Sequence, residues 1–197
     1  MNTAITTATP LRFSAENHSH KAIFASALIA AAESEVPVYI GRIALPGHRV
    51  ACLRAEGRAR TDANRLRLGC KYRERQTWGG NPFTLDEMGR LAEGAIEGLI
   101  SVQAAPVVAG VDARPDVLLS NIRFDIKAAY NRPGHSFAVA KSVAGGYDAV
   151  IFVEITADKK MHVWCCKARP DAWEERPGVR GGDNFYLVHC PAPAMLQ

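Results

Sequence analysis

The spacing of hydrophobic residues changes along the chain and predicts both helices and strands. In residues 15–34 and 85–103, apolar residues recur every three or four positions, which is typical of helices that pack on one side. Thr84 stands three residues before Glu87, and this capping-box pattern predicts the start of the second helix. We therefore expect two helices that each present an apolar face to a core.

Two apolar, β-rich runs lie between these helices. Residues 36–45 and 48–56 are separated by Pro46 and Gly47, and Pro-Gly is a strong turn signal. We therefore expect a hairpin of two strands at this place. The basic stretch that follows it gives no clear secondary-structure pattern.

Beyond the second helix the period of the pattern becomes mainly that of strands. We expect strands at 105–112, 116–121, 122–130, 147–156 and 161–168, with a short helix at 134–146. Counted from the helix at 85–103, the order is helix, three strands, helix, strand, and one more strand. This order predicts an α/β fold with a mixed sheet.

Length and composition predict one compact domain with an N-terminal elaboration. The 197 residues suffice for one core, and 48% hydrophobic with 22% charged residues is ordinary for a globular chain. Residues 1–80 are expected to hold the first helix, the hairpin and a basic segment that contacts nucleic acid. Residues 81–197 are expected to form the core domain.

Positive charge is concentrated in residues 54–76. The whole chain has a formal charge of +4, whereas eight basic and three acidic residues give this stretch alone +5. One interpretation is a solvated surface with ion pairs. The other is a strip that contacts phosphates, favoured by the many arginines and by Tyr72 and Trp78. The predicted contacts are Arg58, Arg60, Arg65, Arg67, Lys71, Arg73 and Arg75.

The cysteines and the apolar runs predict a cytoplasmic protein without a membrane partner. The five cysteines are odd in number and lack the spacing of a disulfide scaffold, which favours a reducing compartment. The apolar run at 22–32 is too short to span a membrane, and an Ala-rich helix explains it better.

The stretch RPDVLLSNIRFDIK carries two aspartates and a lysine among apolar residues. Successive side chains of a strand point to opposite faces, so Asp125 and Lys127 share one face. If the Ser-Asn pair is the turn of a hairpin, Asp116 lies beside Asp125. Two close carboxylates repel each other unless a cation lies between them, and Mg²⁺ or Mn²⁺ suits such ligands. The simpler interpretation is a solvated Asp–Lys patch.

The Pro-Asp pair, the nine residues from Asp116 to Asp125 and the following Asp-Ile-Lys resemble the motif of the PD-(D/E)XK nuclease superfamily. The resemblance covers residues 84–168, and that family's restriction-endonuclease-like core runs helix, three strands, helix, strand. It implies that Asp116 and Asp125 bind metal and that Lys127 is the catalytic lysine. Asp125 stands where glutamate is more usual, and its shorter side chain would shift the metal geometry.

Many members of that family also place a glutamate of the first core helix at the metal. Glu93 is the position that we choose, and Glu97, one turn later, competes with it. An exposed helix face is an equal alternative for both. His135 and Lys141, on the predicted second helix, are expected to contact substrate, with ordinary surface roles as the alternative.

The resemblance implies a metal-dependent nuclease that hydrolyses phosphodiester bonds. The expected substrate is DNA rather than RNA, cut by an endonuclease of the restriction, repair, recombination or phage-defence type. A homodimer would suit the cutting of both strands of a duplex. The alternative is a catalytically silent protein of the nuclease fold that binds nucleic acid or a protein partner as a regulator or inhibitor.

Overall fold

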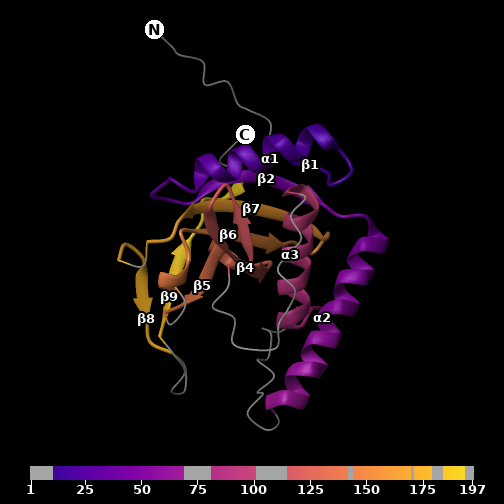
Figure 1. The fold of residues 1–197 in the computed structure, drawn as a ribbon. Coiled ribbons are helices and arrows are strands. Elements are labelled where there is room, and N and C mark those ends of the chain that lie inside the picture. The colour runs from indigo at the N-terminus through magenta and orange to yellow at the C-terminus, as the bar shows by residue number, and fades with distance from the viewer. Residues whose placement is uncertain are drawn as a thin grey trace.

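The computed structural model describes residues 11–68, 81–100, 115–141, 144–169, 171–178 and 184–193. Its centre is a mixed six-stranded sheet, curled in Figure 1, and a three-stranded antiparallel sheet lies beside it. In sheet order, the larger one contains β1 (Arg12–Phe13), β2 (Val38–Ala44), β7 (Lys160–Lys167), β6 (Ala149–Ile155), β4 (Ile122–Tyr130) and β3 (Val117–Leu119). The smaller one contains β5 (Ser136–Ala140), β9 (Phe185–His189) and β8 (Glu174–Arg176). The predicted α/β class with a mixed sheet is confirmed.

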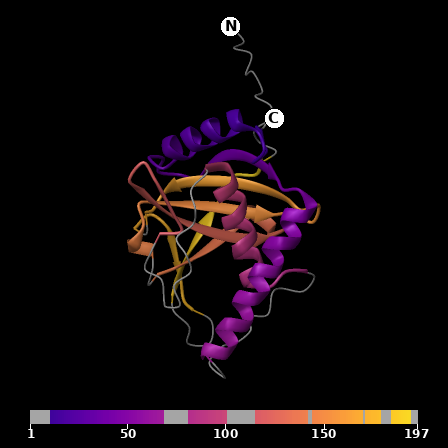
Figure 2. The same cartoon turned by 45° about the vertical axis from the view of Figure 1, so that its right-hand side comes forward.

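The helices pack on one face of the larger sheet. Helices α1 (His18–Ala31) and α3 (Leu85–Ile100) bury side chains such as Phe24 and Leu91 in one core with Phe124 of β4. Helix α2 (Gly47–Leu68) lies outside α3, as Figures 1 and 2 show. None of the described helices is both long and apolar enough to cross a membrane.

The smaller sheet covers part of the opposite face. Phe137 of β5 and Val188 of β9 form a second core with Phe152 and Trp164 of the larger sheet. Along β4, Phe124 and Ile126 belong to the helix-side core, whereas Ala129 belongs to the second core. Asp125 and Lys127 alternate with Phe124 and Ile126, so they lie on the face away from α1 and α3.

The predicted hairpin at 116–130 is confirmed as β3 and β4. The two strands pair antiparallel, with Val117 opposite Phe124. Ser120 and Asn121 make the turn, with φ of 50° and 66°. Two successive positive φ values are characteristic of the tight hairpin turn whose twist matches the strands, and asparagine tolerates this conformation.

The two helices predicted from their periodicity are confirmed, with clear start signals. Helix α1 begins at His18 because the side chain of Asn17 accepts hydrogen bonds from the backbone N–H of Ser19 and His20. At α3 the capping box forms as predicted: Glu87 N–H donates to Thr84 Oγ1 at 3.1 Å, and Thr84 N–H donates to Glu87 Oε2 at 2.8 Å.

The predicted hairpin at 36–56 is wrong in its second half. Residues 38–44 are strand β2, but residues 48–56 belong to α2. The Pro-Gly pair begins this helix, since Val50 N–H donates to the carbonyl of Pro46 at 3.1 Å. Val50, Leu53, Gly57 and Thr61 are buried at helical spacing, and the stretch is rich in the strong helix formers Ala, Arg and Leu.

The predicted short helix at 134–146 is also wrong. Its described residues form the 3₁₀ turn Pro133–His135, strand β5 and a second 3₁₀ turn, Ala144–Gly146. Phe137 and Val139 are buried and alternate with exposed Ala138, which is the period of a strand. His135 and Lys141 therefore do not lie on an α-helix. The strand predicted at 105–112 lies outside the described residues.

The segment 1–80 shares the sheet with the later strands. Strand β2 pairs antiparallel with β7, from Val38 opposite Cys165 to Ala44 opposite Lys160. The last two predicted strands, now β6 and β7, are confirmed as neighbours in the same sheet.

Candidate functional site

Asp116 and Asp125 face each other across the start of the β3–β4 hairpin. The antiparallel register pairs Val117 with Phe124, and one further step places Asp116 opposite Asp125. Residues directly opposite in such a pair lie on the same face, with Cβ atoms about 5 Å apart. The Asp116 side chain is fixed there because its Oδ2 accepts a 2.7 Å hydrogen bond from the backbone N–H of Ile126.

Asp125 is buried and forms an ion pair with Lys127. Its residue is 3% exposed, and its Oδ1 accepts a 2.9 Å hydrogen bond from Lys127 Nζ. Lys127 Nζ also lies 2.7 Å from Oδ2, which has this ion-pair contact but no hydrogen bond among the described atoms. Burial of the Asp125 charge is therefore compensated mainly by Lys127.

The pKa of Asp116 is raised to about 7, from an ordinary value of 3.8. Burial is the largest cause, and the neighbouring charge of Asp125 is the second. The Ile126 hydrogen bond and Lys127 lower the pKa, while Glu93 raises it further. Asp125 and Glu93 therefore both raise the pKa of Asp116, and Lys127 offsets part of this effect.

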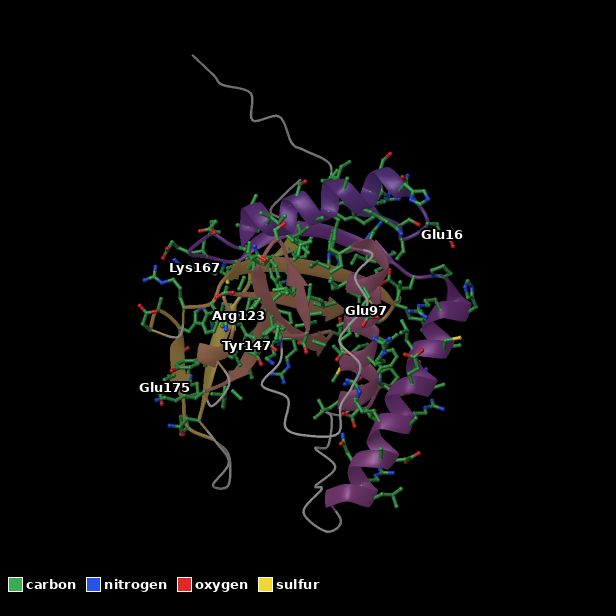
Figure 3. The ribbon with its side chains drawn as sticks, viewed as in Figure 1. Glu16, Glu97, Arg123, Tyr147, Lys167 and Glu175 are labelled. Carbon is green, nitrogen blue, oxygen red and sulfur yellow. The ribbon has the colours of Figure 1, made fainter. Side chains whose placement is uncertain are left out.

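Glu93, rather than Glu97, is the glutamate that acts on Asp116. The guanidinium of Arg60 holds Glu93 through two hydrogen bonds, each of 2.9 Å. Glu97 instead accepts from both terminal nitrogens of Arg90, at 2.8 and 3.2 Å. Figure 3 labels Glu97 on α3.

Tyr147, which sequence reasoning missed, also belongs to this site. Burial and then the charges of Asp125 and Asp116 raise the pKa of its phenol far above the ordinary value, and a hydrogen bond with Asp125 adds to the shift. The next residue, Asp148, is held in place by three hydrogen bonds of 2.9 to 3.0 Å, which the backbone N–H and the guanidinium of Arg123 donate to its carboxylate. These bonds also restrain the position of the adjacent Tyr147. Figure 3 labels Arg123 and Tyr147 beside each other.

Most of the described residues predicted to contact nucleic acid have acidic partners instead. Arg58 shares Glu87 with Arg54, Arg60 binds Glu93, and Arg65 lies 3.7 Å from Asp62. Lys141 Nζ lies 2.7 Å from Glu175, and His135 Nδ1 lies 2.5 Å from buried Glu154. The side chain of Arg67, and all of Lys71, Arg73 and Arg75, lie outside the described residues.

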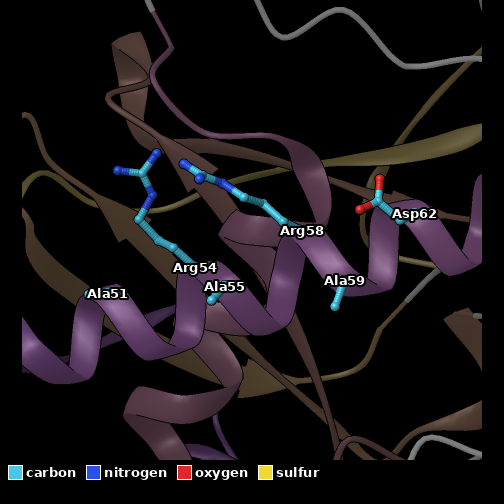
Figure 4. Close-up of a pocket in the computed structure, with 6 residues that line it drawn as sticks. All are labelled: Ala51, Arg54, Ala55, Arg58, Ala59 and Asp62. Carbon is cyan, nitrogen blue, oxygen red and sulfur yellow. The ribbon is translucent and has the colours of Figure 1, made fainter.

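A surface groove on α2 is lined by Ala51, Ala55, Ala59, Arg54, Arg58 and Asp62 (Figure 4). Its two arginines, side by side in Figure 4, both donate through Nε to Glu87 Oε1 at 3.0 Å. Glu87 and the lining residue Asp62 together balance the two positive charges of the groove.

The oxygen donors of the site fit a hard divalent cation. Asp116 and Asp125 supply two carboxylates on one face, and Oδ2 of Asp125, which accepts no hydrogen bond among the described atoms and contacts Lys127 as an ion pair, could also bind a cation. Within the described ranges, no three His, Cys, Asp or Glu side chains are grouped closely enough to hold a metal ion by themselves. A magnesium ion normally keeps several waters and uses only one or two protein carboxylates.

Comparison with known proteins identifies no relative. No protein-family model matches the chain, and no curated protein matches it. The functional assignment below therefore depends on the residues of the site.

Proposed function

We propose that this protein is a metal-dependent nuclease that hydrolyses phosphodiester bonds, with DNA as its substrate. The observation that carries the proposal is the close pair of carboxylates Asp116 and Asp125, in which burial and the neighbouring charge raise the pKa of Asp116 to about 7, with Lys127 against the buried carboxylate of Asp125. Two close carboxylates repel each other, and a bound cation would offset that repulsion.

Asp116 and Asp125 would hold Mg²⁺ or Mn²⁺, and Glu93 would add negative charge from α3. The bound cation would polarise the phosphate and lower the pKa of a water molecule. Lys127 has a side chain that is 25% exposed, so its ammonium group can reach solvent while it touches Asp125. Its role in the proposal is to orient the attacking water and to offset negative charge on the phosphate.

We further propose that residues 84–168 form a divergent restriction-endonuclease-like core. Helix α3, the β3–β4 hairpin and strand β6 parallel to β4 support this assignment. Strand β5 stands where that core has its second helix, which is the main departure from the pattern. The carboxylates and Lys127 do not depend on that segment.

Cleavage of supercoiled plasmid with Mg²⁺ or Mn²⁺ tests the function. The native chain is expected to cut the plasmid, Lys127→Ala to abolish cutting, and Lys167→Ala, an exposed lysine on β7, to leave it unchanged. Metal-dependent cutting that survives in Lys127→Ala would contradict the proposed site. Metal-independent DNA binding without any cutting would support the alternative of a catalytically silent binding protein.

A further inference from the structure

A row of polar side chains crosses four strands of the larger sheet, away from the carboxylate site. The register places Arg12 of β1 opposite Arg42 of β2, Arg42 opposite His162 of β7, and His162 opposite Glu154 of β6. Phe13, Ile43 and Met161, their neighbours along the strands, belong to the helix-side core. The row therefore lies on the face away from the helices.

The two arginines of this row lack acidic partners. In the described part of the chain, neither Arg12 nor Arg42 forms an ion pair with a carboxylate. Arg12 is exposed and Arg42 is half-buried. Like charges directly opposite each other in a sheet are destabilising, so this arrangement favours the binding of an anion between them.

The carboxylate of Glu154, at the end of the row, already has hydrogen-bond partners. Glu154 Oε1 accepts a 2.9 Å hydrogen bond from the backbone N–H of Arg132, and His135 Nδ1 lies 2.5 Å from Oε2. Glu154 is 3% exposed. It therefore ties the segment after β4 to β6 and does not neutralise Arg42.

His162 is fixed beside Arg42 and flanked by aromatic rings. Its Nδ1 lies 2.8 Å from the hydroxyl of Tyr39, and its ring centroid is 5.9 Å from that of Tyr39. The row thus combines two unpaired arginines with a histidine and a half-buried tyrosine, the composition that binds nucleic-acid backbones and bases. The arginines of α2 differ, because Arg54, Arg58 and Arg60 each contact a carboxylate, that of Glu87 or of Glu93.

We propose that the row Arg12, Arg42 and His162 binds the phosphate backbone of duplex DNA, as a surface separate from the carboxylate site. From β1 to β7 the row spans two strand spacings, about 10 Å. That distance exceeds the width of one phosphate group, so the row fits successive phosphates of a polyanion. This surface gives the proposed nuclease a second point of attachment to its substrate.

The row can be tested independently of cleavage. Asp125 lies level with Val150 of β6, whereas the row lies level with Glu154, four residues or about 13 Å further along the strand. The smaller sheet covers Phe152 and Trp164 between the two places. Substitutions in the row therefore leave Asp116, Asp125 and Lys127 untouched.

The experiment is the salt dependence of binding to a fluorescein-labelled duplex, followed by fluorescence anisotropy in EDTA. The slope of log K against log salt is negative, and each lost phosphate contact makes it less steep by about 0.9. Near 0.1 M salt this corresponds to about 8-fold weaker binding. We expect this loss for Arg12→Gln and for Arg42→Gln, and about twice the change in slope for the double variant. Arg176→Gln, an exposed arginine paired with Glu174, is the matched control and is expected to bind like the native chain.

The proposal is overturned if the native chain does not bind the duplex, or if Arg42→Gln keeps the native slope. Thermal melting separates a binding defect from misfolding: loss of like-charge repulsion should leave the melting temperature of Arg42→Gln equal or higher at low salt. A large fall in that temperature would also contradict the proposal. Salt-sensitive binding without cleavage would retain this surface and reject only the nuclease activity.

Discussion

At the residue scale, the pKa values of two carboxylates, buried Glu87 and partly buried Asp116, shift in opposite directions. Burial raises the pKa of Glu87, but the Thr84 N–H and the guanidinium groups of Arg54 and Arg58 more than reverse it, so the net pKa is lowered. Asp116 receives one backbone hydrogen bond and faces Asp125, and its pKa is raised to about 7. Glu87 is therefore compensated by partners within the fold, whereas the negative charge of Asp116 is compensated only in part.

Replacing Asp116 by Asn should change how stability depends on pH in metal-free buffer. Because the folded pKa of Asp116, about 7, exceeds its ordinary 3.8, this carboxyl stabilises the fold fully below the unfolded pKa and loses that contribution as pH rises through 7. We expect the free energy of unfolding of Asp116→Asn, relative to the native chain, to rise by a few kcal/mol between about pH 4 and pH 8. Urea unfolding in EDTA measures it.

The comparison with Asp116→Asn isolates one group from others that titrate nearby. Burial lowers the pKa of His162, which makes the native chain less stable as pH falls and so acts in the opposite direction. Asp158→Asn is the control, because Lys160 lowers the pKa of that exposed aspartate to about 2, outside the pH window. A parallel pH dependence for the native chain and Asp116→Asn would show that Asp116 titrates normally.

At the element scale, the sequence predicted an element correctly where neighbouring residues form the turn or the cap that begins or ends it. The Ser-Asn turn fixed the β3–β4 hairpin, and with it the opposition of Asp116 and Asp125. The capping box fixed the start of α3. These signals predicted the centre of the candidate site because turn and cap chemistry involve only neighbouring residues.

The elements that were misread depend on distant partners. Strand β5 pairs with β9, which lies more than forty residues later, from Ser136 opposite His189 to Ala140 opposite Phe185. The buried face of helix α2 packs against α3, and this contact between distant segments could not be seen in the sequence. Tyr147 and the row from Arg12 to His162 were missed for the same reason, since strand pairing brings their residues together.

The crossing of α2 and α3 provides a prediction about packing. A Cβ atom added at Gly57 would lie 2.6 Å from the Cα of Glu87, a backbone atom that cannot move freely. Gly57→Ala is therefore expected to lower the free energy of unfolding by about 1–3 kcal/mol, although alanine favours helix by about 1 kcal/mol.

Gly89→Ala on α3 is the matched control for Gly57→Ala. Its nearest neighbour would be Glu93 Oε1 at 3.9 Å, so there is room for the methyl group. We expect this substitution to stabilise the protein by roughly 0.5–1 kcal/mol. Equal effects of the two substitutions in denaturant unfolding would show that the helices do not approach each other closely at Gly57.

At the scale of the whole molecule, ion pairs join the helices, whereas charges of one sign gather at the carboxylate site and along the row on the sheet. Glu87 and Glu93 join α3 to the arginines of α2. The carboxylate site has surplus negative charge, and the row of Arg12 and Arg42 has surplus positive charge. Metal ions would complement the carboxylate site, and a DNA backbone would complement the row.

Divalent metal should stabilise the whole protein through the carboxylate site. At a concentration of about 100 times the dissociation constant, Mg²⁺ or Mn²⁺ would add about 2.7 kcal/mol, or roughly 5–10 °C in melting temperature for a chain of this size. Asp125→Asn is expected to lose the response, and Asp158→Asn, at an exposed aspartate outside the site, is expected to keep it. Differential scanning fluorimetry with and without metal measures both, and an unchanged response in Asp125→Asn would place the metal elsewhere.

The central claim is a division of roles between carboxylates that hold metal and a lysine that acts on the reacting water. Single-turnover cleavage of a labelled duplex, measured against Mg²⁺ concentration, tests it most directly. We predict that Asp116→Asn shifts the curve to higher Mg²⁺, and that Lys127→Ala lowers the plateau rate by about 10²–10⁴-fold without shifting the curve. Cleavage that does not depend on Mg²⁺, or a native plateau in Lys127→Ala, would contradict the account.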